Sequence, residues 1–400
     1  MGTSGRTSHK NYARKRGKYT SSKRKKVQER ASLQKFSIGL NNTTNSIKQS
    51  IRWQRVKWDP VKLYPNIIFD KNDNPDRSPT PEEVALACKI VNDKFFLLHK
   101  GRSVVRDPLD KNSIIAVIEF TRWDKLSDKD KKDLEFVSTF LHGSKRFINS
   151  VSSSNRSWGG KMWAIGWQKS QDFLQIVGRY IKQFNASQKT KYDIHFSQSS
   201  RAGRIIGKYF KELSSVAFNN NRATMEKFNI PSFDHLSYGK KPNPTTCSPH
   251  ITFTTDNFFN PPHIDKGDIS DYAFVMFLPT YSATGKLAGP DSNYDVSGGP
   301  FVFPDHQFGI KFNHQHGIVK MIWKANKYRH SLTCDKEQKG YYNNPLQYFD
   351  RETGSAIVGL LVDPQTLLAH NAAQQEVAYY AQLADNECGS TFTRYTSQTH

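Results

Sequence analysis

The chain has 400 residues, of which 36% are hydrophobic and 12% aromatic; this supports a folded core and excludes a chain that is disordered throughout. Its formal net charge of +22 favours polyanionic partners or anionic surfaces. The four cysteines form no Cys-x-x-Cys pair, so no zinc ribbon or disulfide framework is expected, and a reducing compartment fits best. No apolar stretch approaches the roughly 18 residues of a membrane span, and we expect no secretory signal.

The N-terminal segment is strongly basic. Residues 1–30 carry eleven Lys and Arg and one acidic residue, with almost no large apolar side chains. Such a segment cannot offset its ordering entropy by burial, so we expect about 1–55 to be a disordered tail. Basic clusters at 14–16 and 23–26 predict a nuclear-import signal, a nucleic-acid-binding arm, or both, and thus a nuclear protein. The alternative is a solvated tail that only aids solubility.

Helices and two strands are predicted in the half that follows. Thr80, Pro81 and Glu83 form a helix start, and a second helix begins after Ser127. Apolar spacing predicts two more helices, which should cover one face of a sheet. The expected helices are 82–92, 128–141, 170–184 and about 200–228, the strands are 103–106 and 114–120, and 231–249 is a loop.

Residues 152–167 contain three tryptophans and three glycines within ten positions, in the stretch WGGKMWAIGW. One interpretation is a loop that lines a nucleic-acid cleft, in which Trp158 offers a stacking face and Arg156 a fork for phosphate or base edges. The other is a strand pair that packs Trp163 and Trp167 into the core. The sequence leaves both open.

From residue 251 onward, short apolar runs alternate with Gly, Pro, Asn and Asp, which is typical of a β-sandwich or barrel. The predicted strands are 251–254, 272–278, 300–303, 309–312, 317–323, 331–333 and 355–362. A helix over 364–383 and a polar tail should follow.

The stretch NFFNPPHID at 257–265 suggests a metal site. His263 and Asp265 are two residues apart, so on a strand an imidazole and a carboxylate would lie on the same face. With a second imidazole they would form the two-His-one-carboxylate triad of non-haem Fe(II) oxygenases. A turn histidine beside a surface aspartate is the alternative, because chance alone supplies roughly one His-x-Asp or His-x-Glu in such a chain.

The second imidazole is expected from His330. The apolar strand 317–323 leads up to it, and the 67-residue separation from His263 suits a ligand that arrives late on the facing sheet. His314 and His316 are rivals that precede this strand, where the chain would turn at the wrong end.

A series of segments, taken in chain order, resembles the Tet-like 2-oxoglutarate/Fe(II) oxygenases of expanded fungal families. The series consists of NFFNPPHID, Asp268, the stretch at 272–274, GGPFVFP at 298–304, the strand at 317–323 and His330. WGGKMWAIGW adds to the likeness, which points to the compact, zinc-free Tet/JBP-type members. It implies an α+β fold with a double-stranded β-helix (jelly-roll, cupin-like) core, padded by helices from the N-terminal half. It also implies a single dioxygenase domain over 56–400, in which 56–245 precede a core at 246–365, and a helix and tail follow at 366–400.

The same resemblance implies the cofactors. His263, Asp265 and His330 would hold Fe(II), which 2-oxoglutarate would chelate and O2 would reach. An arginine would pair with the far carboxylate of 2-oxoglutarate. Arg351, with Ser355 nearby, is the expected partner, and Lys336 or Lys339 are alternatives.

The expected substrate is a methylated nucleobase, most directly 5-methylcytosine in DNA. In some compact relatives a carboxylate at the position of Asp268 faces the cytosine amine, and here its alternative is a turn cap. A flipped base could stack on Trp158 or Tyr272. N6-methyladenine, RNA or protein substrates are rivals, and a non-catalytic nucleic-acid-binding protein is the alternative from another class. The oligomeric state cannot be predicted.

Overall fold

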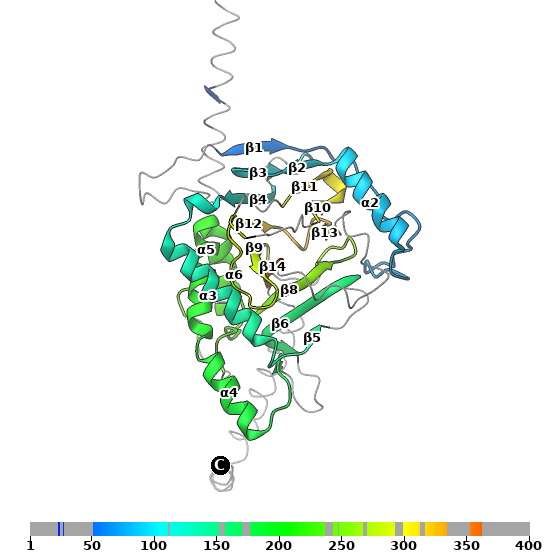
Figure 1. Ribbon diagram of the computed structural model, residues 1–400. Coiled ribbons are helices and arrows are strands. Elements are labelled where there is room, and N and C mark those ends of the chain that lie inside the picture. Colours follow the sequence, from blue (N-terminus) through cyan, green and yellow to red (C-terminus); the bar gives the residue numbers. More distant parts are fainter. Residues whose placement is uncertain are drawn as a thin grey trace, which may run out of the picture.

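The computed structural model shows two β-sheets with helices on their outer faces (Figure 1). It describes residues 23, 24, 27, 51–110, 113–151, 157–169, 177–236, 243–246, 248–266, 270–292, 299–312, 317–333 and 353–361. Within this part of the chain, no helix is both long and apolar enough to cross a membrane.

The larger sheet has ten strands among the described residues. Its order is β1-β3-β4-β12-β9-β14-β8-β6-β5, and β7 branches from β6. All pairings are antiparallel except that of β1 with β3. The strands are β1 (Arg52–Arg55), β3 (Arg102–Arg106), β4 (Ile114–Thr121), β5 (Ser150–Val151), β6 (Gly159–Lys169), β7 (Val177–Arg179), β8 (His250–Phe259), β9 (Ala273–Tyr281), β12 (Ile318–Trp323) and β14 (Thr353–Leu361).

The smaller sheet has the order β13-β10-β11-β2. Its strands are β2 (Phe96–Leu98), β10 (Phe301–Phe303), β11 (Phe308–Ile310) and β13 (Ser331–Leu332), and the short helix η2 (Pro304–His306) joins β10 to β11. The two sheets pack through one apolar cluster, to which β9 and β12 contribute alternate residues such as Val275, Phe277 and Met321. The side-chain period of two along a strand explains this alternation.

Helices cover the outer faces of both sheets. The intervening residues of the large sheet, such as Phe274, Met276 and Ile322, pack under α3 (Asp128–Ser144), α5 (Ser199–Leu213) and α6 (Ser215–Lys227). Helix α2 (Pro81–Lys94) packs with Val302 of the small sheet. Helix α4 (Ala186–Phe196) extends this helical layer, and η1 (Trp123–Lys125) precedes α3. The site described below lies between the sheets, away from the helical layer.

Local capping explains where these helices begin. Thr80 and Glu83 form a reciprocal capping box at α2, as predicted, and Ser127 caps α3. Asn185 and Gln188 form a second capping box, which starts α4. Ser214 ends α5 and caps α6 with its side chain.

Several predicted elements differ from the structure. The helix over 170–184 is wrong for its described part, because 177–179 form β7 and 181–184 are irregular. The helix over 200–228 is two helices broken at Ser214, and α4 was not predicted. β1 lies inside the stretch expected to be disordered. The predicted helix over 364–383 lies outside the described residues.

The WGGKMWAIGW segment is mainly a strand, β6, rather than a loop. Trp167 is buried and donates its indole N–H to Ser232 O at 2.9 Å, while Trp163 is half-buried and stacks on Phe253. Gly160 has a φ of +68° and lies against the backbone of Phe258, where a Cβ atom would come within 2.5 Å. This glycine therefore serves close strand packing.

Candidate metal centre

Three side chains from distant parts of the chain meet between the two sheets. His263 Nε2 lies 3.4 Å from Asp265 Oδ1, and His330 Nε2 lies 3.5 Å from Asp265 Oδ2. One ligand atom from each of the three lies within 4.8 Å of the other two. Among the described residues, no other group of His, Cys, Asp and Glu converges in this way.

Backbone hydrogen bonds bring the two ligand-bearing segments together. After β8, Pro261 and Pro262 cannot donate to a sheet ladder, which favours the departure of the chain from the large sheet. The chain then pairs with the segment before β13: His263 N–H donates to His330 O at 3.0 Å, and His330 N–H donates back at 2.9 Å. Asp265 N–H donates to Ala325 O at 3.0 Å. The spacing of the three side chains is therefore set by main-chain geometry.

Both imidazoles are held in the tautomer that a metal ion requires. His263 Nδ1 lies 2.8 Å from Pro261 O, and His330 Nδ1 lies 3.0 Å from Tyr328 O. Because a carbonyl oxygen can only accept, each Nδ1 must carry the proton and donate it. In the neutral rings, each Nε2 then keeps a lone pair directed at Asp265, as in metal sites whose second ring nitrogen is fixed by a hydrogen bond.

One side of the group is closed by aromatic rings. The ring of His330 stacks on Phe301 at 5.5 Å and meets Trp323 edge-on at 5.4 Å. Burial, followed by the nearby His263, lowers the pKa of His330, which keeps this imidazole neutral and able to bind a metal ion. His330 is buried, whereas His263 and Asp265 are only partly buried. The open side gives access from solvent.

The geometry around Asp265 fits a shared cation. The carboxylate of Asp265 faces the Nε2 atoms of both imidazoles. Its distances to them, 3.4 and 3.5 Å, exceed an ordinary hydrogen bond. Donor atoms that share one first-row metal ion lie roughly 3 to 3.5 Å apart, because each lies about 2.1 Å from the ion. The three residues therefore fit a divalent metal with open positions.

Two features of this centre were missed by sequence reasoning. Tyr328, whose carbonyl fixes the tautomer of His330, donates its hydroxyl to Asp107 Oδ2 at 2.8 Å and lies 3.2 Å from Ser113 Oγ. The indole N–H of Trp323, beside His330, is buried without an acceptor in the described structure. The sequence held no signal for Asp107, which lies more than 200 residues away; Trp323 was visible only as the end of an apolar strand.

The remaining predicted site residues are placed as follows. Trp158 packs against Tyr64 and Phe259 in the cluster beneath α2. Tyr272 belongs to the cluster beneath the helices, and burial, followed by Asp271, raises its pKa to about 12. Neither placement brings these rings to the metal centre. Ser355 lies in β14 opposite Pro279, and Arg156, Asp268, Arg351, Lys336, Lys339, His314 and His316 lie outside the described residues.

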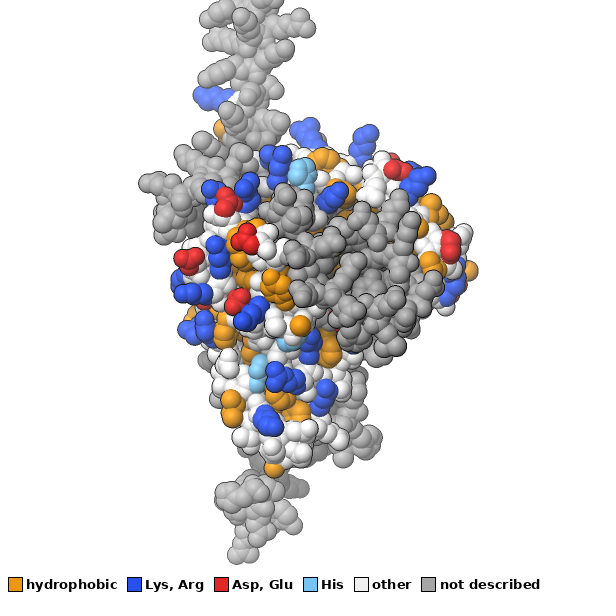
Figure 2. All heavy atoms as spheres, in the orientation of Figure 1, with side chains coloured by type: hydrophobic (Ala, Val, Ile, Leu, Met, Phe, Trp, Pro, Cys, Tyr) orange, Lys and Arg blue, Asp and Glu red, His pale blue; other side chains and the backbone are white. Residues whose placement is uncertain are grey.

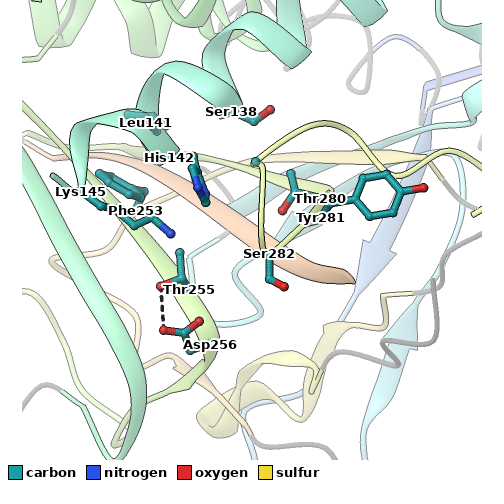
Figure 3. A pocket seen from close by; sticks show the side chains of 11 residues that line it. Ser138, Leu141, His142, Lys145, Phe253, Thr255, Asp256, Thr280, Tyr281 and Ser282 are labelled. Atoms are coloured by element: carbon teal, nitrogen blue, oxygen red, sulfur yellow. Dashed lines mark hydrogen bonds between the residues drawn. The ribbon is translucent and has the colours of Figure 1, made fainter. Parts of the chain in front are cut away.

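A separate hollow lies on the helix-covered side of the large sheet (Figure 3). His142 of α3 and Lys145, which directly follows that helix, face Asp256 of β8 and Thr280 of β9 across it. The hollow shares no residue with the metal centre, and Leu141 and Phe253 in its wall belong to the core beneath the helices. It is therefore not the entrance to the group of His263.

A family model described as the Tet-like 2OG-Fe(II) oxygenase superfamily matches residues 127–334, just over half of the chain. Two similar solved structures are "The structure of OsALKBH1", at 10% identity over 62% of this chain and 96% of that one, and a "prolyl hydroxylase in complex with hypoxia inducible factor oxygen degradation domain peptide fragment from Trichoplax adhaerens", at 12% identity over 63% and 86%. Their TM-scores of 0.30 and 0.29 are too low to support a conclusion. No curated protein matches the sequence.

Proposed function

The chain belongs to the Tet-like 2OG-Fe(II) oxygenase superfamily, and on that basis we propose that it oxidises a methylated nucleobase, most directly 5-methylcytosine in DNA. As a member of this family it is a dioxygenase that uses Fe(II), 2-oxoglutarate and O2. Bound together, these groups supply the oxidising chemistry, in which 2-oxoglutarate and O2 yield succinate and CO2 and one oxygen atom enters a substrate C–H bond.

The observation that carries the proposal is the convergence of His263, Asp265 and His330. We assign these three residues to the iron: each histidine would bind through Nε2, while its Nδ1–H stays on a backbone carbonyl. Phe301 and Trp323 exclude water from the buried side. The carboxylate of Asp265 would offset part of the charge of the dication.

The arrangement of the sheets supports a double-stranded β-helix as the fold of the core. β8 and β9 lie in the large sheet, and β10 and β13 lie in the small one. The chain therefore passes from one sheet to the other around a shared apolar core, as a double-stranded β-helix requires. The three ligand candidates lie where 260–263 pair with 330–332. The helices of the N-terminal half then pad the large sheet from outside.

Arg351 and Ser355 are the proposed partners of the far carboxylate of 2-oxoglutarate. The backbone of Ser355 lies in β14, which runs between β9 and β8, and β8 is the strand that precedes His263 and Asp265. The unpaired indole N–H of Trp323 beside His330 is a further donor suited to a carboxylate oxygen. An arginine fork would complete the recognition of the distant carboxylate.

Charge supports a phosphate-bearing substrate. Lys and Arg side chains are spread over the face drawn in Figure 2, where acidic side chains are fewer, and the whole chain carries +22. Binding should therefore weaken as salt rises. The basic clusters at 14–16 and 23–26 support a nuclear location. Asp268 and Arg156 remain the proposed contacts to the base, whereas the packing of Trp158 and Tyr272 gives no support to their stacking on it.

The test uses the full chain with Fe(II), 2-oxoglutarate and duplex DNA that carries 5-methylcytosine. We expect loss of 5-methylcytosine together with succinate, measured by mass spectrometry of nucleosides and of the co-product, and no turnover by His263→Ala. Matched duplexes with N6-methyladenine, methylated RNA and a peptide identify the substrate class. Succinate coupled only to another substrate overturns the choice of base, and DNA binding without turnover on any substrate favours a non-catalytic binding protein.

A further inference from the structure

A short loop far from the metal centre in sequence is folded by its own side chains. Asp70 Oδ1 accepts the N–H groups of Asn72 and Asn74, each at 2.8 Å, and Asp70 Oδ2 accepts the side-chain amide of Asn74 at 3.0 Å. The backbone closes the same turn, with Asp70 N–H donating to Asn74 O at 2.9 Å and Asp73 N–H donating to Asp70 O at 3.0 Å. We refer to residues 70–76 as the Asp70 loop. These hydrogen bonds are local to the loop, and Lys266 Nζ, from the residue after Asp265, also donates to Lys71 O at 2.7 Å.

Asp73 is the one acidic residue of this loop that is buried, and its carboxylate contacts residues next to the metal centre. Its φ of +67° is left-handed, a conformation that aspartate tolerates better than most residues, and only 8% of it is exposed. Asp73 Oδ1 accepts a hydrogen bond from Arg329 Nη2 at 2.8 Å. Asp73 Oδ2 lies 3.1 Å from Lys266 Nζ, a contact between charges without hydrogen-bond geometry.

The two cations that meet at Asp73 each adjoin a ligand candidate in the chain. Lys266 follows Asp265, and Arg329 precedes His330. Arg329 also donates through Nη1 to Pro262 O at 3.2 Å, just before His263. A second acid, Asp305, lies 4.0 Å from Arg329 Nε, too far to replace the 2.8 Å contact. One carboxylate therefore ties together the outer side of both ligand-bearing segments.

We propose that Asp73 is a positioning residue for the metal centre, acting through Lys266 and Arg329. It supports the separation that the backbone hydrogen bonds set between the two segments, and it neutralises cations that would otherwise oppose a nearby divalent ion. This rests on the proposed function of the centre. The Asp70 loop lies outside residues 127–334, so the family match does not include it.

The test measures Co(II) binding to the metal-free full chain by its d–d absorption, which requires no turnover. Asp73→Asn keeps the shape of the side chain and removes its charge. We expect about 10- to 100-fold weaker Co(II) binding, the range for groups that support metal ligands. Asp73→Asn/Lys266→Met should regain part of the affinity, because it also removes one uncompensated cation. A purely structural role for Asp73 predicts no such rescue.

Asp130→Asn is the matched control. Asp130 is a partly buried carboxylate of α3 that accepts from Lys208 and the Tyr209 hydroxyl, on the helix-covered side of the large sheet. The Asp130→Asn substitution should lower the unfolding midpoint and leave Co(II) affinity unchanged.

Three results separate the proposals. If wild type binds no Co(II) at all, the metal centre itself is wrong. If wild type binds Co(II), His263→Ala does not, and Asp73→Asn binds as tightly as wild type, only the role of Asp73 is wrong. Should Asp73→Asn fail to fold, Arg329→Lys, which keeps the charge but cannot make both hydrogen bonds, is measured instead, and unchanged affinity overturns the proposal.

Discussion

Two clusters of three polar side chains lie on opposite faces of the large sheet, and each is built around one carboxylate. On the helix-covered face, Glu119 of β4 lies 2.7 Å from Lys320 Nζ and 3.4 Å from Arg102 Nη1. Between the sheets, Asp265 lies 3.4 and 3.5 Å from the Nε2 atoms of His263 and His330. The first cluster pairs an anion with two permanent cations. The second pairs an anion with two imidazoles whose Nε2 atoms are suited to bind a metal ion.

The two clusters differ in how closely their polar groups contact one another and in whether one side stays open to a ligand. Lys320 is almost fully buried, and Arg102 also donates to Leu213 O at 2.9 Å, so the Glu119 cluster joins β3, β4 and β12 to the end of α5, and both of its cations contact Glu119. A buried cluster of this kind is costly to break and has little capacity to bind anything else. The Asp265 cluster instead keeps distances that exceed a hydrogen bond and an open side. Equal numbers of polar residues therefore give a fold-stabilising contact in one case and a binding centre in the other.

Replacing the carboxylate of the Asp265 cluster should have the largest effect on function. Asp265→Asn keeps the size of the side chain but removes its charge, and we expect it to abolish both Co(II) binding and succinate formation. The unfolding midpoint of the metal-free chain should stay close to wild type, because Asp265 lies farther from both imidazoles than an ordinary hydrogen bond. Titration with Co(II) and thermal unfolding measure the two quantities. Retained Co(II) affinity would contradict the assignment of Asp265.

The equivalent change in the Glu119 cluster should lower stability and leave metal binding unchanged. Glu119→Gln leaves Lys320 and Arg102 buried without their anion, and we expect it to lower the free energy of unfolding by about 3–5 kcal/mol. Urea denaturation measures this loss, while Co(II) affinity of the folded protein should not change. Glu119→Leu/Lys320→Met is the control, because replacing this pair with apolar side chains should restore part of the stability while Arg102 still lacks its anion. A Glu119→Gln protein as stable as wild type would refute the comparison.

The sequence was informative wherever the signal was local. Short apolar runs such as those of β4, β9 and β12 predicted strands, and the capping box of Thr80 and Glu83 predicted the start of α2. The spacing of His263 and Asp265, the strand that leads to His330 and the family resemblance together predicted that these three residues meet. Their role as iron ligands remains a proposal that the Co(II) experiments address.

Contacts between distant segments could not be predicted in this way. The apolar spacing over 200–228 continues across Ser214, so it indicated one helix where the hydroxyl of Ser214 starts a second. β1 has too little apolar character to stand out from the basic tail and is held by its pairing with β3. Asp73 and Asp107 resemble ordinary turn residues, and only the folded chain shows that they contact Arg329 and Tyr328 beside the metal centre.

Mild acid should distinguish the two sides of the large sheet further. His306 of η2 is buried between Trp58 and Tyr328, and burial lowers its pKa to about 4. Its Nδ1 has no partner in the described structure, so a proton added there would remain uncompensated. Between about pH 6.5 and 4 the unfolded chain binds this proton and the folded chain does not, so stability falls as pH falls across that window. The pKa of Glu119 is lowered from 4.5, so its ion pairs persist until the pH falls below that value.

The expected loss from His306 is up to about 1.4 kcal/mol per pH unit, or roughly 3 kcal/mol across the window. Urea unfolding of wild type and His306→Gln at pH 7.5 and pH 5 measures it. The difference between the two proteins isolates this histidine from others with lowered pKa values, such as His142 and His195 on the helix-covered side. His306→Gln should lose less stability on acidification. Equal losses in both proteins would show that the acid sensitivity arises elsewhere, and that the side facing the small sheet is no more sensitive than the helix-covered one.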